Sequence, residues 1–159
     1  MRAARPETKI ILTEPANAAL LASDIAQERR VNGAPQSGHP AWEPHPIQGW
    51  TPDFIPLVLQ ETIDKKSYDQ LLPVNGDDGV AWAQKLAKQE GILTGISGGS
   101  TFAITMQIAQ SAKAGSVLLC MLPDTGERYM STPLFESIEA EMNAEEEAIS
   151  RSTPTAQME

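Results

Sequence analysis

The sequence predicts an α/β domain built as three αβα layers around a mostly parallel sheet. Apolar runs typical of buried strands alternate with segments whose apolar residues recur at helical spacing. The chain has 159 residues, of which 41% are hydrophobic, so it is long enough for one domain with a buried core. Ligands in such sheets bind beyond the carboxyl ends of the strands. We therefore expect functional loops directly after the strands.

The first strand is predicted at 9–13, where Lys-Ile-Ile-Leu-Thr runs into Glu-Pro. Asn17 is a candidate N-cap for a helix that continues toward Arg30. The stretch 31–56 is dense in proline, and a loop of this length is either functional or disordered. Its two tryptophans and one phenylalanine favour packing over disorder.

Helical and strand patterns are clearer in the middle of the chain. Residues 55–63 are apolar enough for a buried segment, and 71–74 are typical of a short strand. Asn75 and two following aspartates favour a helix start, because acidic groups stabilise the first turn. That helix is predicted to end at Gly91, a C-terminal cap. A second helix follows Ser100, and its expected inward-facing residues are Phe102, Ile104, Ile108 and Ala109.

The clearest buried strand in the sequence is Val-Leu-Leu-Cys-Met-Leu at 117–122, a continuous apolar run of the parallel-sheet type. Burial there favours a structural role for Cys120. The last helix is predicted from about Pro133 toward Ile149, with four apolar residues on one face: Leu134, Ile138, Met142 and Ile149. We divide the chain into a main domain at 1–135 and an acidic C-terminal helix and tail at 136–159.

The net charge of −9 is concentrated near the C-terminus. Residues 1–123 carry twelve acids and ten bases, whereas 124–159 carry nine acids and two bases. No basic stripe is present, so we expect no nucleic-acid partner. No apolar run approaches the ~20 residues of a membrane span, so we expect no membrane association. A single cysteine and the lack of a visible secretory signal favour the cytoplasm, with an organelle left open.

Two glycine-bearing loops carry the candidate chemistry. Ser97-Gly98-Gly99-Ser100 offers hydroxyls and backbone N–H groups with little bulk, which lets a flat or anionic ligand approach. A tight turn capped by Ser100 explains the same residues. The loop at 123–128 follows a predicted strand and is either a ligand loop or a turn. The two histidines, His39 and His45, lack a third residue at metal-ligand spacing, so we expect no metal site.

Four ordered segments carry a family resemblance. They are Pro-His-Pro-Ile-Gln-Gly at 44–49, Phe-Ile-Pro at 54–56, Glu-Gly-Ile-Leu-Thr-Gly-Ile-Ser-Gly-Gly-Ser at 90–100, and Leu-Pro-Asp-Thr-Gly-Glu-Arg-Tyr-Met-Ser-Thr at 122–132. Together they resemble the C-terminal half of cysteine synthase (O-acetylserine sulfhydrylase), a pyridoxal-phosphate enzyme of the tryptophan-synthase-β-like group, fold type II. The variation at Gly98 and Ser100 is closer to the cystathionine β-synthase relatives.

The resemblance implies specific roles for four residues. The hydroxyl of Ser97 meets the pyridine nitrogen of pyridoxal 5′-phosphate, and Pro123 and Asp124 lie near the same edge of the ring. Gly49 borders the substrate side of the pocket. A neutral hydroxyl does not hold the ring nitrogen protonated, which suits loss of acetate from O-acetylserine and addition of sulfide. The implied partners are a small amino-acid substrate and a second copy in a homodimer.

The sequence departs from the family pattern in three ways. Trp50 stands in a loop that is normally built from small residues, and 24–44 is longer than the family leads us to expect. The Schiff-base lysine and the glycine-rich phosphate loop of the family are expected upstream of Met1, so the resemblance implies no catalytic residue within this chain. We therefore expect an incomplete half of such an enzyme, inactive alone.

Two other functions stay open at this point. One is a non-catalytic binding module derived from the same family, which docks a partner such as serine acetyltransferase. The other is an unrelated α/β domain that binds a nucleotide or phosphate through its glycine-bearing loops.

Overall fold

The computed structural model describes residues 3–152 of the chain. Its regular elements are two strands, four α-helices and two short 3-10 helices. In order they are β1 (Ile11–Pro15), α1 (Leu57–Asp64), β2 (Gln70–Val74), α2 (Gly76–Glu90), α3 (Ile96–Ala109), η1 (Gly126–Tyr129), η2 (Pro133–Phe135) and α4 (Ala144–Ser152).

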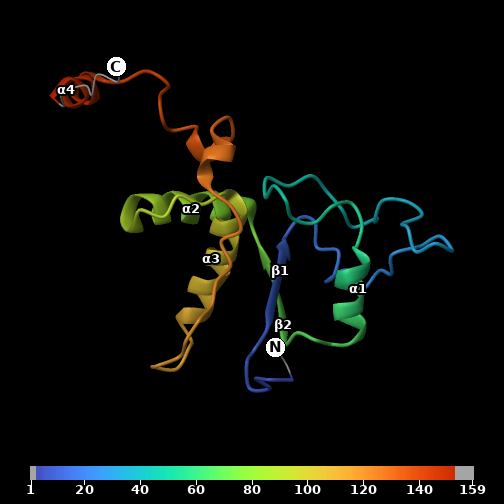
Figure 1. Cartoon of the computed structure of the whole chain (residues 1–159). Helices are drawn as coiled ribbons and strands as arrows, with labels where there is room; N and C mark the ends of the chain where they lie inside the picture. Colours follow the sequence, from blue (N-terminus) through green and yellow to red (C-terminus); the bar gives the residue numbers. More distant parts are fainter. Residues whose placement is uncertain (1–2, 153–159) are drawn as a thin grey trace, which may run out of the picture.

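The sheet lies between helices (Figure 1). β1 and β2 pair in parallel, with Ile11 opposite Gln70 and Pro15 opposite Val74. α1 lies on one side of this pair, and α2 with α3 lies on the other. The chain is therefore a mixed α/β fold with a parallel sheet, as the alternation of elements predicts.

α2 forms where its end signals predict. Asn75 is the N-cap residue, and Asp77 and Asp78 occupy the first turn. Gly91 ends the helix in the left-handed conformation, with φ 68°, and its backbone N–H donates to the carbonyl of Leu86. A left-handed C-cap favours glycine because it has no Cβ to clash.

α2 and α3 pack closely because glycines stand at their contact. A Cβ on Gly99 would lie 2.0 Å from the carbonyl oxygen of Gly79 and 2.7 Å from the amide nitrogen of Ala83. A Cβ on Gly79 would lie 2.1 Å from Oγ of Ser100. These distances are far inside van der Waals contact, so the two helix backbones approach as closely as glycine permits.

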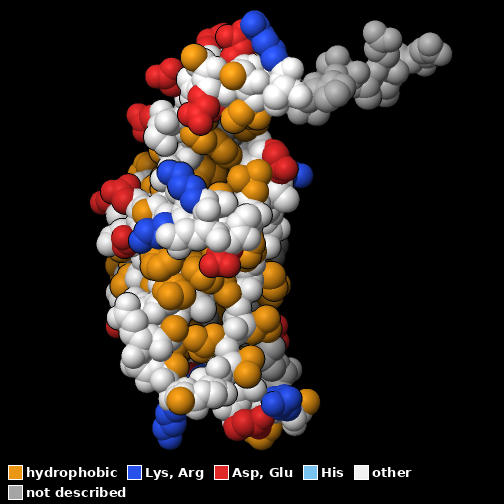
Figure 2. Space-filling view, turned by 90° about the vertical axis from the view of Figure 1, so that its left-hand side faces the viewer, with side chains coloured by type: hydrophobic (Ala, Val, Ile, Leu, Met, Phe, Trp, Pro, Cys, Tyr) orange, Lys and Arg blue, Asp and Glu red, His pale blue; other side chains and the backbone are white. Residues whose placement is uncertain are grey.

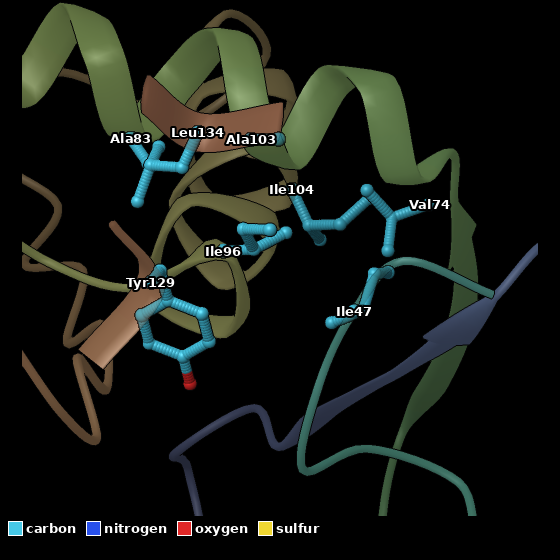
Figure 3. Close-up of a cluster of buried hydrophobic side chains, with 8 residues drawn as sticks. All are labelled: Ile47, Val74, Ala83, Ile96, Ala103, Ile104, Tyr129 and Leu134. Atoms are coloured by element: carbon cyan, nitrogen blue, oxygen red, sulfur yellow. The ribbon is translucent and has the colours of Figure 1, made fainter. Parts of the chain in front are cut away.

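Two buried clusters form the core. The larger joins the sheet, α2, α3 and the η1–η2 region through eight residues: Ile47, Val74, Ala83, Ile96, Ala103, Ile104, Tyr129 and Leu134 (Figure 3). The smaller consists of Ala18, Leu20 and Ile55, with half-buried Trp42 against it. Trp42 also donates from Nε1 to the carbonyl of Thr51 at 2.9 Å. The proline-dense stretch is thus packed, as its aromatic residues predict.

The predicted helix after Asn17 does not form, and the prediction was wrong. Residues 16–23 make turns, with no helix up to Arg30. The reason lies in Glu14, whose carboxylate oxygens accept hydrogen bonds from the backbone N–H groups of Leu21 and Ala22, each at 2.9 Å. In a helix those two N–H groups would donate to carbonyls one turn back.

The predicted buried strand at 117–122 is also wrong. This segment is assigned to no strand, and its apolar side chains are largely exposed: Val117 at 93%, Leu119 at 89% and Met121 at 70%. Cys120 is half-buried, and burial raises the pKa of its thiol. A strand needs a neighbour to satisfy its backbone, and none of the described residues pairs with this segment.

Three further expectations need correction. The helix predicted from Pro133 to Ile149 is divided into η2 and α4, and of its four apolar residues only Leu134 is buried. The segment 55–63 is helical from Leu57, and α1 contains no fully buried residue. α3 begins at Ile96, before Ser97, and not after Ser100. The tail beyond 152 lies outside the described residues.

Within residues 3–152, no helix has both the length and the apolar character that crossing a membrane would require.

Gly99→Ala tests the helix contact. The added methyl group meets the backbone of α2, so we expect a loss of about 1–3 kcal/mol of unfolding free energy. Gln107→Ala, an exposed change on the same helix, is the control and should alter stability by less than ~0.5 kcal/mol. Chemical denaturation of both variants measures the difference, and equal stabilities would contradict the close-contact account.

Candidate functional site

Ser97 lies in the first turn of α3 and is only 3% exposed. Its hydroxyl Oγ donates to Oδ1 of Asp124 at 3.5 Å, which is a long and weak hydrogen bond. The predicted glycine-bearing loop is therefore the start of the helix itself. Ser100 is not its cap, because its hydroxyl lies within the helix and donates to the carbonyl of Ile96 at 2.8 Å.

Asp124 is placed beside Ser97 by contacts between two loops. Thr94 donates from Oγ1 to the backbone carbonyl of Asp124 at 3.2 Å. Thr94 and Thr125 form an antiparallel bridge, and the N–H of Gly126 donates to the carbonyl of Leu93 at 3.2 Å. The segments 93–97 and 124–126 are thus joined along their backbones.

Tyr129 completes this cluster. Its hydroxyl donates a hydrogen bond to Oδ2 of Asp124, and the residue is 5% exposed. The bond to Asp124, burial and the carboxylate charge all raise the pKa of Tyr129. Figure 3 shows the hydroxyl pointing away from Ala83 and Leu134. We refer to Ser97, Asp124 and Tyr129 as the α3 cluster.

Gly95 makes the α3 cluster possible. A Cβ at this position would lie 2.4 Å from Oδ1 of Asp124 and 2.4 Å from the ring of Tyr129. Any larger residue would push both side chains away from the helix start.

Gly49 lies in a different place. It lines a largely apolar cavity of about 320 Å³ between the sheet and the loop 49–56. Trp50 lines the same cavity and also packs against the larger core cluster. The structure therefore brings Ser97 and Asp124 together, leaves Pro123 exposed beside them, and puts Gly49 on the wall of a separate cavity.

The buried carboxylate of Glu14 forms part of that cavity wall. Burial raises its pKa, although the N–H groups of Leu21 and Ala22 lower it. The side chain thus anchors the turn at 20–22 against the end of β1.

The ring nitrogens of the two histidines contact backbone carbonyls of neighbouring loop segments. His39 is 3% exposed, with Nε2 3.0 Å from the carbonyl of Ile25. Nε2 of His45 lies 3.2 Å from the carbonyl of Thr51. Among residues 3–152, no group of three or more possible metal ligands is assembled.

Sequence reasoning missed Tyr129 and Thr94 as members of the site. Tyr129 lies five residues after Asp124, within the segment 122–132 that carries the family resemblance. The sequence therefore contained the residue but did not show that its hydroxyl contacts Asp124. Thr94 was visible only as part of the run before Ser97. Side-chain partners across a loop do not follow from spacing alone.

Comparison with known proteins places the chain in a class. Residues 1–124 match the family of pyridoxal-phosphate-dependent enzymes. The chain is 41% identical over 139 residues to O-ureido-L-serine synthase of Streptomyces lavendulae, covering 87% of this chain and 37% of that protein. It is 36% identical over 111 residues to cysteine synthase of Staphylococcus aureus, covering 70% of this chain and 34% of that one.

Solved structures agree. A crystal structure of O-ureido-L-serine synthase bound to O-ureido-L-serine superposes with a TM-score of 0.72 at 38% identity, covering 97% of this chain and 41% of that chain. Cysteine synthase from Entamoeba histolytica superposes with a TM-score of 0.63 at 27% identity, covering 87% and 36%. The chain thus spans roughly two fifths or less of the length of these relatives.

The chain belongs to the pyridoxal-phosphate-dependent enzyme family. Within that family its relatives include cysteine synthases and an O-ureido-L-serine synthase, which are fold-type-II enzymes.

The α3 cluster contains a hydroxyl of the kind that the ring nitrogen of this cofactor would need. A pyridine nitrogen needs a single hydrogen-bonding group, and the weakly held hydroxyl of Ser97 can supply it. The described chain contains no buried lysine that could bind the cofactor covalently. Its six lysines are all exposed: Lys9, Lys65, Lys66, Lys85, Lys88 and Lys113. The roles of Ser97, Pro123, Asp124 and Gly49 in binding remain predictions.

Asp124→Asn tests the electrostatics of the α3 cluster. Without the carboxylate charge, the pKa of Tyr129 should fall toward the usual value of about 10. A Tyr68→Phe background leaves Tyr129 as the only tyrosine, so tyrosinate absorbance against pH reports it alone. Since the folded-state pKa is raised, the associated stability is complete below the unfolded pKa and declines as pH rises through the folded value. An unshifted titration in Asp124→Asn would contradict the contact.

Glu14→Ala tests the anchor of the turn at 20–22. The variant leaves the N–H groups of Leu21 and Ala22 without their acceptor, so we expect a loss of about 2 kcal/mol. Amide exchange at these two residues should accelerate at the same time. Glu43→Ala removes an exposed carboxylate and is the control. Unchanged exchange in Glu14→Ala would show that the turn is held by other contacts.

Proposed function

We propose that this chain supplies the ring-nitrogen side of a pyridoxal-phosphate site in an enzyme that replaces the β-substituent of an O-acylserine. In the form we favour, sulfide forms the new bond to the β-carbon of O-acetylserine, acetate leaves, and cysteine results. The observation that carries this proposal is the α3 cluster, which holds a nearly buried serine hydroxyl, weakly bonded to Asp124, at a helix start.

Ser97 and Asp124 have different roles within the α3 cluster. Asp124 accepts a hydrogen bond from Tyr129 on Oδ2 and one from Ser97 on Oδ1, at 3.5 Å. The bond from Ser97 is long and weak, so its hydroxyl can turn toward another acceptor. Asp124 and Tyr129 are positioning residues, since they act on the cofactor only through Ser97.

The cofactor, and not the protein, would supply the bond-breaking chemistry. When bound, pyridoxal phosphate supplies an electron sink that labilises bonds at the α- and β-carbons of an amino acid. A hydroxyl partner leaves the ring nitrogen neutral and the sink moderate. That setting favours β-replacement over reactions that need a long-lived carbanion.

The named relatives support the same reaction class. Cysteine and O-ureido-L-serine both carry a heteroatom on the β-carbon of an alanine skeleton, so one scaffold serves a sulfur or an oxygen nucleophile. Trp50 narrows the cavity beside Gly49 and is our candidate for selecting between them. We further propose that the complete enzyme is a cytoplasmic homodimer.

Reconstitution tests this function. The full chain is co-expressed with the portion of the S. lavendulae O-ureido-L-serine synthase that it does not match. We expect the complex to retain pyridoxal phosphate and to form cysteine from O-acetylserine and sulfide. Ser97→Ala should lower the rate about tenfold, the equivalent of ~1.4 kcal/mol for one hydrogen bond.

The chain alone is the control. Because all six lysines are exposed, equimolar pyridoxal phosphate followed by borohydride should label no single lysine in preference to the others, as mass spectrometry can measure. Stoichiometric labelling of one lysine would contradict the view that the chain lacks a covalent partner for the cofactor. A complex that binds no cofactor would contradict the proposed function itself.

A further inference from the structure

Trp50 stands between two residues whose backbone is left-handed. Gly49 has φ 84° and Thr51 has φ 38°. Glycine adopts such angles freely because it has no Cβ, whereas a β-branched residue adopts them only at a cost in free energy. Contacts elsewhere in the protein must therefore hold Thr51 in this conformation.

Two side-chain rings converge on the backbone carbonyl of Thr51. Nε1 of Trp42 donates to this oxygen at 2.9 Å, and Nε2 of His45 lies 3.2 Å from it. A carbonyl oxygen only accepts hydrogen bonds, so Nε2 of His45 carries the hydrogen. The oxygen has two lone pairs, and the two rings use both. We refer to Trp42, His45 and Thr51 as the Thr51 clamp.

The two rings of the Thr51 clamp are themselves held in place. Trp42 packs against the smaller core cluster, and its backbone N–H donates to the carbonyl of His39 at 3.0 Å. His45 is two residues from Ile47, which is fully buried in the larger core cluster. The clamp therefore ties the segment 49–51 to both clusters of the core.

The Thr51 clamp contains two features that lower stability. Nδ1 of His45 is buried, and no described residue makes a hydrogen bond with it. A buried nitrogen without a partner costs free energy, as does the left-handed backbone of Thr51. Two such costs in one short segment are typical of a conformation that serves a function, and not of packing alone.

The residue that the clamp positions is Trp50. Its backbone N–H donates to the carbonyl of Ile47 at 3.3 Å, and its half-buried indole packs against the larger core cluster. Together with Gly49, it also lines the cavity of about 320 Å³. A change in the backbone angles of Thr51 would alter the direction of the chain next to Trp50 and so move the indole on the cavity wall.

We propose that Trp42 and His45 are positioning residues for the selection of a substrate. They hold Thr51 left-handed and so fix the indole of Trp50 on the cavity wall, where it limits the space beside Gly49. This inference rests on the proposed function, in which Gly49 borders the substrate side of the site. A small nucleophile such as sulfide fits there, and a thiol with a bulky apolar substituent is excluded.

Amide exchange in the chain alone tests the Thr51 clamp. Trp42→Phe keeps an aromatic ring against the smaller core cluster but removes the donor to Thr51. Relative to the amides of α2, we expect the N–H of Trp50 to exchange with deuterium about tenfold faster in this variant, because its bond to Ile47 depends on the same turn. His45→Leu removes the other donor and is the second variant if Trp42→Phe does not fold.

Trp82→Phe is the matched control for the exchange. It removes an indole from α2, a helix on the face shown in Figure 2, where hydrophobic side chains are widely spread. This indole lines no part of the cavity beside Gly49. We therefore expect the exchange at Trp50 to stay unchanged in Trp82→Phe.

Selectivity in the co-expressed complex tests the consequence. We compare kcat/KM for sulfide with kcat/KM for phenylmethanethiol at saturating O-acetylserine. Trp42→Phe should lower the preference for sulfide about fivefold, through a lower KM for the thiol, and should leave kcat for sulfide within about twofold. Trp50→Ala should lower the preference as much, and the double variant should lose no more, because both changes act through one indole.

The possible outcomes separate the clamp from the function. Unchanged exchange at Trp50, unchanged selectivity, additive losses in the double variant, or equal effects of Trp42→Phe and Trp82→Phe overturn the inference. A complex that forms no cysteine overturns the proposed function, and the selection of a nucleophile with it. Faster exchange at Trp50 in the chain alone would still support the clamp in that case.

Discussion

The close approach of α2 and α3 is the constraint on which the candidate site depends. Gly99 and Gly79 leave no room for a side chain between the two helices. The position of α3 then determines where Ser97 lies, because this serine is in the first turn. Dispersion forces act only over short distances, so a helix contact without gaps fixes the helix start more firmly than a loop could. A cofactor contact made by a short hydroxyl side chain needs that firmness.

The same constraint explains why Asp124 belongs to the cluster although it comes from an irregular segment. Thr94 and Leu93 precede α3 directly, and they bind the backbone of 124–126. Gly95 leaves the space that Asp124 and the ring of Tyr129 occupy. The loop is thus held by the residues that lead into the helix, and these contacts tie the α3 cluster to the start of α3.

The sequence predicted correctly those elements whose ends are fixed by neighbouring residues in the chain. The caps and acidic first turn of α2 lie within its own sequence, and the helix formed as expected. The helix after Asn17 failed because Glu14 takes the N–H groups of Leu21 and Ala22. The strand at 117–122 failed because pairing depends on a neighbour that local composition does not reveal. For the site, the family resemblance pointed to Ser97 and Asp124 but not to the hydroxyl of Tyr129 between two loops.

The absence of a strand at 117–122 and the unpaired edge of β1 have one physical cause. A parallel pair of two strands is marginal in water, because most of its backbone and one flank stay hydrated. Here α1 contributes no fully buried residue, so the pair of strands is stabilised mainly on its other side, where the larger core cluster packs Val74 with residues of α2 and α3. The sheet and the helix that carries Ser97 therefore stabilise each other through one shared core.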